Sequence, residues 1–165
     1  MGNEDDLSRR ALERIEHCND PKDLRRVANN ALDSGDDVVR QAALRKLYFV
    51  SPDAAPGTLE HAVWQSIYSL EDSLKSERGK TVLLSRTRQK IRRDGEVSTV
   101  SDLVRKPASE GYRMILDRGW PELTFDAVAL KHPDRFEPSV LSAAEARLCG
   151  SGALTDATFI PEVGP

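Results

Sequence analysis

The chain has 165 residues, of which 39% are hydrophobic, 31% are charged and only 5% are aromatic, and its formal net charge is −3. This length favours one compact domain or two small helical lobes, and this composition argues against wholesale disorder. No apolar run reaches the roughly 18 residues that span a bilayer, and the acidic N-terminus lacks the pattern of a signal peptide. A cytoplasmic location without membrane contact is therefore predicted.

The first 50 residues predict three amphipathic helices, which together form an N-terminal helical lobe (residues 1–50). Asp20 and Pro21 provide an N-cap and a favoured first helical residue for the second helix. Gly35 is suited to end that helix, and Asp36 begins the third. The resulting hairpin resembles one unit of a helical repeat array, but no second copy follows at the expected period.

Residues 51–57 contain two prolines and a glycine and predict a linker. A C-terminal helical bundle is expected over residues 58–149, followed by an extended or disordered tail over residues 150–165. Helices within the bundle are predicted over residues 58–78, 82–93, 99–106, 109–118, 121–131 and 138–148. No segment shows sustained alternation, so the predicted fold is all-α, a bundle of about seven or eight helices.

Three details of the bundle follow from local patterns. Trp64 and Tyr68 lie four residues apart, so they can stack along one helix. The neighbouring acidic pair that begins at Glu71 is interpreted as part of a solvated helix face. Thr99 is expected to act as an N-cap, with Asp102 as the acidic member of a capping box.

The unusual segment of the chain is basic. Residues 75–93 carry eight Lys and Arg residues against one Glu, a charge of +7, so the remaining residues sum to −10. Helical geometry places these cations on both flanks of an apolar stripe, where their guanidinium groups could contact phosphates. The candidate anion- or partner-binding residues are Lys80, Arg86, Arg88, Lys90, Arg92 and Arg93.

Three interpretations of the basic segment remain open. The cations can pair with the many acidic residues of the chain, or bind an acidic protein, or bind a nucleic acid or another polyphosphate. A helix-turn-helix is disfavoured, because only Arg105 is basic in the helix that would read the bases. The negative charge of the whole chain also counts against nonspecific DNA binding.

No pattern in the sequence indicates catalysis or a cofactor. The three His residues are isolated, and no Cys or His pair has the spacing of metal ligands. Cys18 and Cys149 are expected to be reduced thiols. Gly79 with the two residues after it is similar to the end of a phosphate-binding loop, but Leu74 stands where that loop requires glycine. We therefore expect no enzyme, no metal and no cofactor.

Two strings of residues resemble a segment that recurs in uncharacterised bacterial proteins. They are Leu84–Ile91 (LSRTRQKI) and Pro121–Val128 (PELTFDAV), and the likeness extends over about half the chain. The resemblance implies a bacterial source and an all-helical fold. It implies no established activity, so it assigns no functional residues.

The sequence thus predicts a non-enzymatic helical interaction protein with a basic contact helix. A protein is the first partner expected, nucleic acid is the second, and the oligomeric state is left open. One alternative is a nucleic-acid-binding accessory domain. Another is a small-molecule sensor with an interhelical pocket, for which Trp64, Tyr68 or Trp120 are the expected lining residues.

Overall fold

The computed structural model describes residues 2–152 of the chain. The chain divides into two compact units, Met1–Asp53 and Ala54–Pro165. The division falls inside the segment 51–57, where the sequence predicts a linker. From residue 153 onward, the predicted tail lies outside the described residues.

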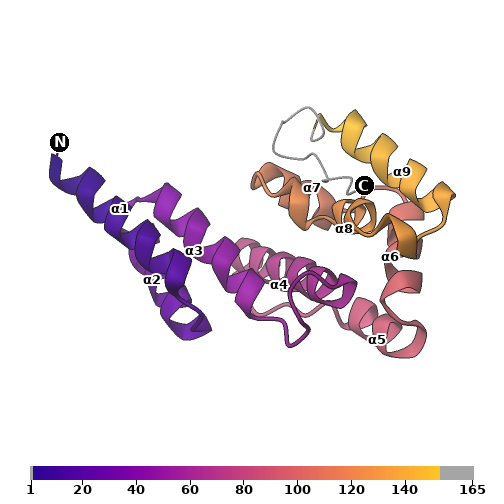
Figure 1. Ribbon diagram of the computed structural model, residues 1–165, viewed down its shortest axis with the longest axis horizontal. Helices are drawn as coiled ribbons and strands as arrows, with labels where there is room; N and C mark the ends of the chain where they lie inside the picture. Colours follow the sequence, from indigo (N-terminus) through magenta and orange to yellow (C-terminus); the bar gives the residue numbers. More distant parts are fainter. Residues whose placement is uncertain (1, 153–165) are drawn as a thin grey trace. The chain divides into compact units, whose positions relative to one another are not determined.

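All regular structure in the described residues is helical, so the predicted all-α class is confirmed (Figure 1). Nine α-helices and two short 3-10 helices are present in this part of the chain. The first unit contains α1 (Gly2–His17), α2 (Pro21–Ser34) and α3 (Asp37–Val50). The second unit contains α4 (Leu59–Arg78), α5 (Ser85–Asp94), α6 (Glu96–Arg105), α7 (Glu110–Asp117), η1 (Pro121–Leu123), α8 (Phe125–Lys131), η2 (Pro133–Arg135) and α9 (Pro138–Gly150).

The first unit is a three-helix arrangement in which α3 packs against both α1 and α2. The side chain of Asp20 accepts a hydrogen bond from a backbone N–H of the first turn of α2. Gly35 ends α2 with φ 76°, a left-handed conformation that glycine adopts without steric cost. Asp36 caps α3 and also accepts a hydrogen bond from Ser8 Oγ at 2.5 Å, which ties α1 to the α2–α3 turn. These caps fix where the helices begin and end.

The second unit is built on packing among α4, α6, α8 and α9. Its apolar core takes one or more side chains from nearly every helix of the unit. Fully buried members include Val63 and Ile67 of α4, Val100 of α6, Val128 of α8 and Val140 of α9. This core is mainly aliphatic. Outside this core packing, α5 packs against α6, and α7 packs against α4.

Two helix starts in the second unit differ from the prediction. The helix expected to begin after Thr99 instead begins at Glu96, directly after Gly95 (φ 85°). Thr99 is inside that helix, where its hydroxyl donates a hydrogen bond to the Gly95 carbonyl at 2.8 Å. The helix expected from Pro121 is a 3-10 turn followed by α8, because Thr124 accepts the Ala127 N–H and acts as a second N-cap.

Candidate functional site

Arg88, one of the predicted contact residues, is held inside the second unit by a carboxylate. Its Nε and Nη2 atoms donate hydrogen bonds to the two carboxylate oxygens of Glu71 at 2.8 and 2.7 Å. Its guanidinium also lies over the rings of Trp64 and Tyr68, 5.2 and 5.8 Å from their centroids. The hydrogen-bonded Glu71 raises the pKa of Arg88. This residue therefore anchors α5 to α4.

Glu71 is only 7% exposed, so its interpretation as part of a solvated face is wrong. Its Oε1 atom also accepts a hydrogen bond from the backbone N–H of Leu84 at 2.8 Å, at the start of α5. The sequence contained a signal for this burial. Glu71 follows Ile67 by four residues and precedes Leu74 by three, which places it on the buried stripe of its helix.

Lys90 and Arg93 also have acidic partners within the unit. Lys90 Nζ lies 2.5 Å from an oxygen of Asp102 on α6 and 3.4 Å from an oxygen of Asp94. Arg93 donates hydrogen bonds to both oxygens of Asp94 at 2.9 Å. Its guanidinium is the main reason that the pKa of Asp94 falls to about 2. The contact between Lys90 and Asp102 joins the end of α5 to α6.

The other three predicted residues, Lys80, Arg86 and Arg92, are exposed to solvent. Across residues 2–152 they form no ion pair. The predicted set therefore separates into two groups. One group holds α5 in place, and the other, which we call the exposed basic group (Lys80, Arg86 and Arg92), presents its charges to solvent.

The second unit also contains a pocket of about 350 Å³ among helices α4 to α9. Its wall is mainly apolar, and the apolar side chains are Leu70, Leu74, Leu84, Leu103, Ile115, Leu123 and Phe125. Arg78, Lys106 and Glu110 also line it, and Arg78 Nη2 lies 3.7 Å from a Glu110 oxygen in a solvent-exposed pair. Trp64, Tyr68 and Trp120 do not line the pocket, contrary to the expectation for a sensor.

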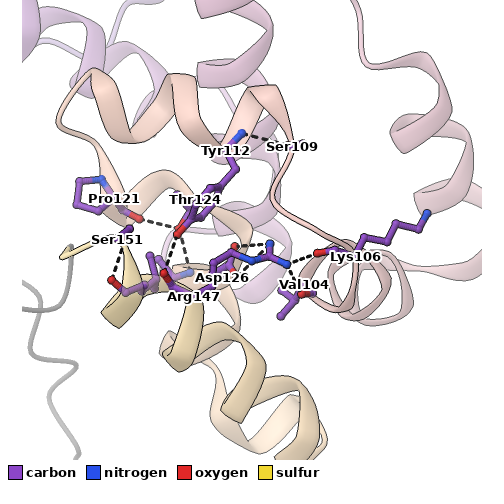
Figure 2. Close-up of polar contacts among 11 residues, drawn as sticks. Val104, Lys106, Ser109, Tyr112, Pro121, Thr124, Asp126, Arg147 and Ser151 are labelled. Carbon is purple, nitrogen blue, oxygen red and sulfur yellow. Dashed lines mark hydrogen bonds and ion pairs between the residues drawn. The ribbon is translucent and has the colours of Figure 1, made fainter.

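Asp126 and Arg147 are the most buried charged residues of the pocket lining (Figure 2). Arg147 Nη1 lies 3.4 and 3.5 Å from the two carboxylate oxygens of Asp126. Its Nη2 donates hydrogen bonds to the carbonyl oxygens of Val104 and Lys106 at the end of α6. The guanidinium also lies 5.4 Å from the centroid of the Tyr112 ring. Arg147 is thus oriented by groups from three other helices or their ends.

Burial dominates the electrostatics at this part of the pocket. Asp126 is 2% exposed, and this desolvation raises its pKa to about 6, although the positive charge of Arg147 acts in the opposite direction. Burial also raises the pKa of Tyr112, whose hydroxyl donates a hydrogen bond to the Arg147 carbonyl at 3.4 Å. The distances of 3.4 and 3.5 Å from Arg147 to the Asp126 carboxylate are long for an ion pair. They are consistent with a carboxylate whose ionised form Arg147 stabilises only in part.

Two of the residues that line the pocket contain a buried side-chain oxygen without a hydrogen bond. They are Ser66 on α4 and Asp126 on α8, and the atoms are Ser66 Oγ and Asp126 Oδ1. Most buried polar atoms in proteins have a hydrogen-bond partner, so such atoms in two residues that line one pocket require an explanation. Sequence reasoning missed this site because Ser66, Asp126 and Arg147 come from distant positions and form no motif.

Comparisons of the chain with protein-family models, curated proteins and solved structures give no match. Within residues 2–152, no helix combines the length and apolar character needed to cross a membrane. The same residues contain no group of three or more His, Cys, Asp or Glu side chains that could hold a metal ion. Cys18 and Cys149 are free thiols. The chain is an all-helical protein for which no family is recognised.

Proposed function

We propose that the second unit is a non-enzymatic binding module that takes a small amphipathic molecule into its interhelical pocket. The observation that carries this proposal is the pairing of about 350 Å³ of mainly apolar space with two unbonded buried oxygens, on Ser66 and Asp126. Ligand pockets in proteins have volumes from about 300 Å³ upward and combine an apolar wall with a few polar groups.

The polar groups around the pocket support binding rather than catalysis. Arg147 is held by the carbonyls at the end of α6, and Thr124 and Ser109 act as N-caps of α8 and α7. The described residues that line the pocket include neither His nor Cys, the side chains most often used as a general base or a nucleophile near neutral pH. These residues can orient a ligand.

Two neighbouring leucines provide a matched test of pocket binding. Leu84 lines the pocket, whereas Leu83 is 56% exposed and does not. We expect 2-naphthol to bind the full-length protein in isothermal titration calorimetry and Leu84→Trp to abolish this binding by filling the pocket. Leu83→Trp, which adds the same volume outside it, should bind normally. Equal binding by both variants would reject the pocket as the site.

A second candidate function is that of an interaction or accessory protein with a basic contact helix, as the sequence predicts. The exposed basic group supports it, because Lys80, Arg86 and Arg92 are solvent-exposed and have no ion-pair partner in the part of the chain that the structure describes. An acidic protein would contact these side chains without first breaking an internal ion pair.

The first unit offers apolar contacts to the same kind of protein partner. Leu7, Leu32 and Val38 are 58%, 57% and 67% exposed. Leu32 and Val38 flank the turn between α2 and α3, and the hydrogen bond from Ser8 to Asp36 brings α1 to this turn. A contiguous exposed apolar patch larger than a few hundred Å² would mark a protein-interaction surface.

Fluorescence anisotropy with labelled DNA and RNA separates the two kinds of partner for the basic surface. Nucleic-acid binding should weaken steeply between about 50 and 200 mM salt and disappear when Lys80, Arg86 and Arg92 are replaced by Ala. The control removes three exposed cations from other helices, with Arg14, Lys22 and Arg113 replaced by Ala. No binding at low salt would leave an acidic protein as the partner class.

A further inference from the structure

We propose that the pocket selects an uncharged ligand, an alcohol, phenol or amide, whose hydrogen-bond donor reaches Asp126 while its apolar body fills the leucine-lined space. This inference rests on the proposed function of the pocket. It adds the chemical class of the ligand, which follows from the charges and hydrogen bonds around Asp126.

The charges at this part of the pocket are already balanced. Asp126 and Arg147 lie 3.4 Å apart, and their side chains are 2% and 18% exposed. The position of Arg147 is fixed by the carbonyls of Val104 and Lys106, so the guanidinium is not free to turn toward a ligand. A ligand that enters the pocket therefore meets a charge pair whose net charge is zero.

A charged ligand would disturb this balance. An ammonium group would add an uncompensated positive charge beside Arg147, and a carboxylate would add a negative charge beside Asp126. Burying an unpaired charge in an apolar site carries a large desolvation cost. A neutral donor adds no charge and avoids that cost. The exposed pair of Arg78 and Glu110 and the exposed Lys106 are solvated and change this comparison little.

The unused hydrogen-bonding capacity of Asp126 and Ser66 indicates that the ligand carries a hydrogen-bond donor. Asp126 Oδ1 is a buried carboxylate oxygen that accepts no hydrogen bond, and an ionised carboxylate can only accept. A hydroxyl or amide N–H of the ligand would supply the missing donor. Ser66 Oγ, which also has no hydrogen bond, can donate or accept and so complements either end of such a group.

The test compares three naphthalene compounds that share one apolar body and differ in their polar group. These are 2-naphthol, naphthalene-2-carboxylate and 2-(aminomethyl)naphthalene, titrated calorimetrically into the full-length protein at about pH 8, where Asp126 is ionised. We expect 2-naphthol to bind at least about tenfold more tightly than either charged compound. Tightest binding of the amine or of the carboxylate would overturn the inference.

Asp126→Asn supplies a second readout on the same three compounds. The substitution leaves the charge of Arg147 uncompensated, so we expect the carboxylate to gain affinity relative to 2-naphthol. Ser66→Ala changes no charge. It should lower the affinity for 2-naphthol without raising the affinity for the carboxylate relative to 2-naphthol. If the asparagine variant fails to fold, the order of affinities in the natural protein still decides.

The outcomes separate the two proposals. Equal affinities for all three compounds, lost in Leu84→Trp, would show that the pocket binds through its apolar wall alone, which overturns the inference and keeps the proposed function. No binding of any compound, or binding that Leu84→Trp leaves unchanged, would reject the proposed function and the inference with it.

Discussion

Arg88 donates two hydrogen bonds to the carboxylate of Glu71, and this pair fixes the basic helix α5 to α4. The same carboxylate accepts the Leu84 N–H, so one buried side chain satisfies both the guanidinium and the first turn of α5. A residue that sequence patterning assigns to a contact surface is therefore part of the internal structure. Substitution of Arg88 should therefore change the stability of the protein, whereas substitution of an exposed cation on the same helix should change only binding.

Arg88→Ala should lower the free energy of unfolding by about 3 kcal/mol, because it leaves the buried Glu71 carboxylate without its counter-charge. The control is Arg92→Ala on the same helix, where the side chain is exposed and the change should stay within about 0.5 kcal/mol. Urea unfolding followed by circular dichroism measures both values. Similar values for the two variants would show that the Glu71 contact contributes little.

Lys90→Ala should destabilise the protein less than Arg88→Ala, and the loss should shrink as salt is added. The reason is that Lys90 forms ion pairs with Asp94 of α5 and Asp102 of α6, and solvent reaches both pairs. Thermal unfolding at low and high ionic strength measures the effect. A loss that does not depend on salt would indicate packing of the lysine stem instead.

The structural role of Lys90 decides which variants are suitable for binding tests. Replacing Lys90 together with Arg86 would mix a structural change with the loss of surface charge. Replacing Lys80, Arg86 and Arg92 removes charges that have no ion-pair partner within residues 2–152. A loss of binding in that variant can then be assigned to the surface alone.

Local signals predicted much of the fold, because caps and apolar stripes act within a few residues. The caps at Asp20 and Gly35 lie where the sequence places them. Thr99 misled the prediction because a threonine inside a helix can donate to the carbonyl four residues before it. The pocket could not be predicted, since Ser66 and Asp126 line the same space only through tertiary packing among several helices.

The stability of the protein should fall as the pH rises through the pKa of Asp126. Burial raises that pKa from 3.8 to about 6, so the folded state binds the proton more tightly than the unfolded state does. The stabilisation from this proton is complete below about pH 4 and is lost as the pH rises past about 6. Asp126→Asn removes the titrating group and should lack this dependence.

Urea unfolding of the natural protein and of Asp126→Asn at about pH 4.5 and 7.5 measures this effect. Between these two values the natural protein should lose about 2 kcal/mol of stability relative to the variant. Because the comparison is with the variant, the other carboxylates cancel. A relative gain instead of a loss would mean that the charge of Arg147 outweighs the burial of Asp126.

Gly111→Ala should narrow the pocket while changing stability by no more than about 1 kcal/mol, because a gain in helix propensity offsets a small packing cost. A Cβ atom at this position in α7 would lie 2.9 and 3.0 Å from the two terminal methyl groups of Leu70. Both residues line the pocket. The flexible end of Leu70 can move only into the pocket, which reduces its volume, or against neighbouring side chains. The affinity for 2-naphthol should therefore fall, whereas Gly150→Ala, which has no atom within 4 Å of its added Cβ, should bind normally. Unchanged affinity in Gly111→Ala would place the bound naphthyl ring away from Leu70.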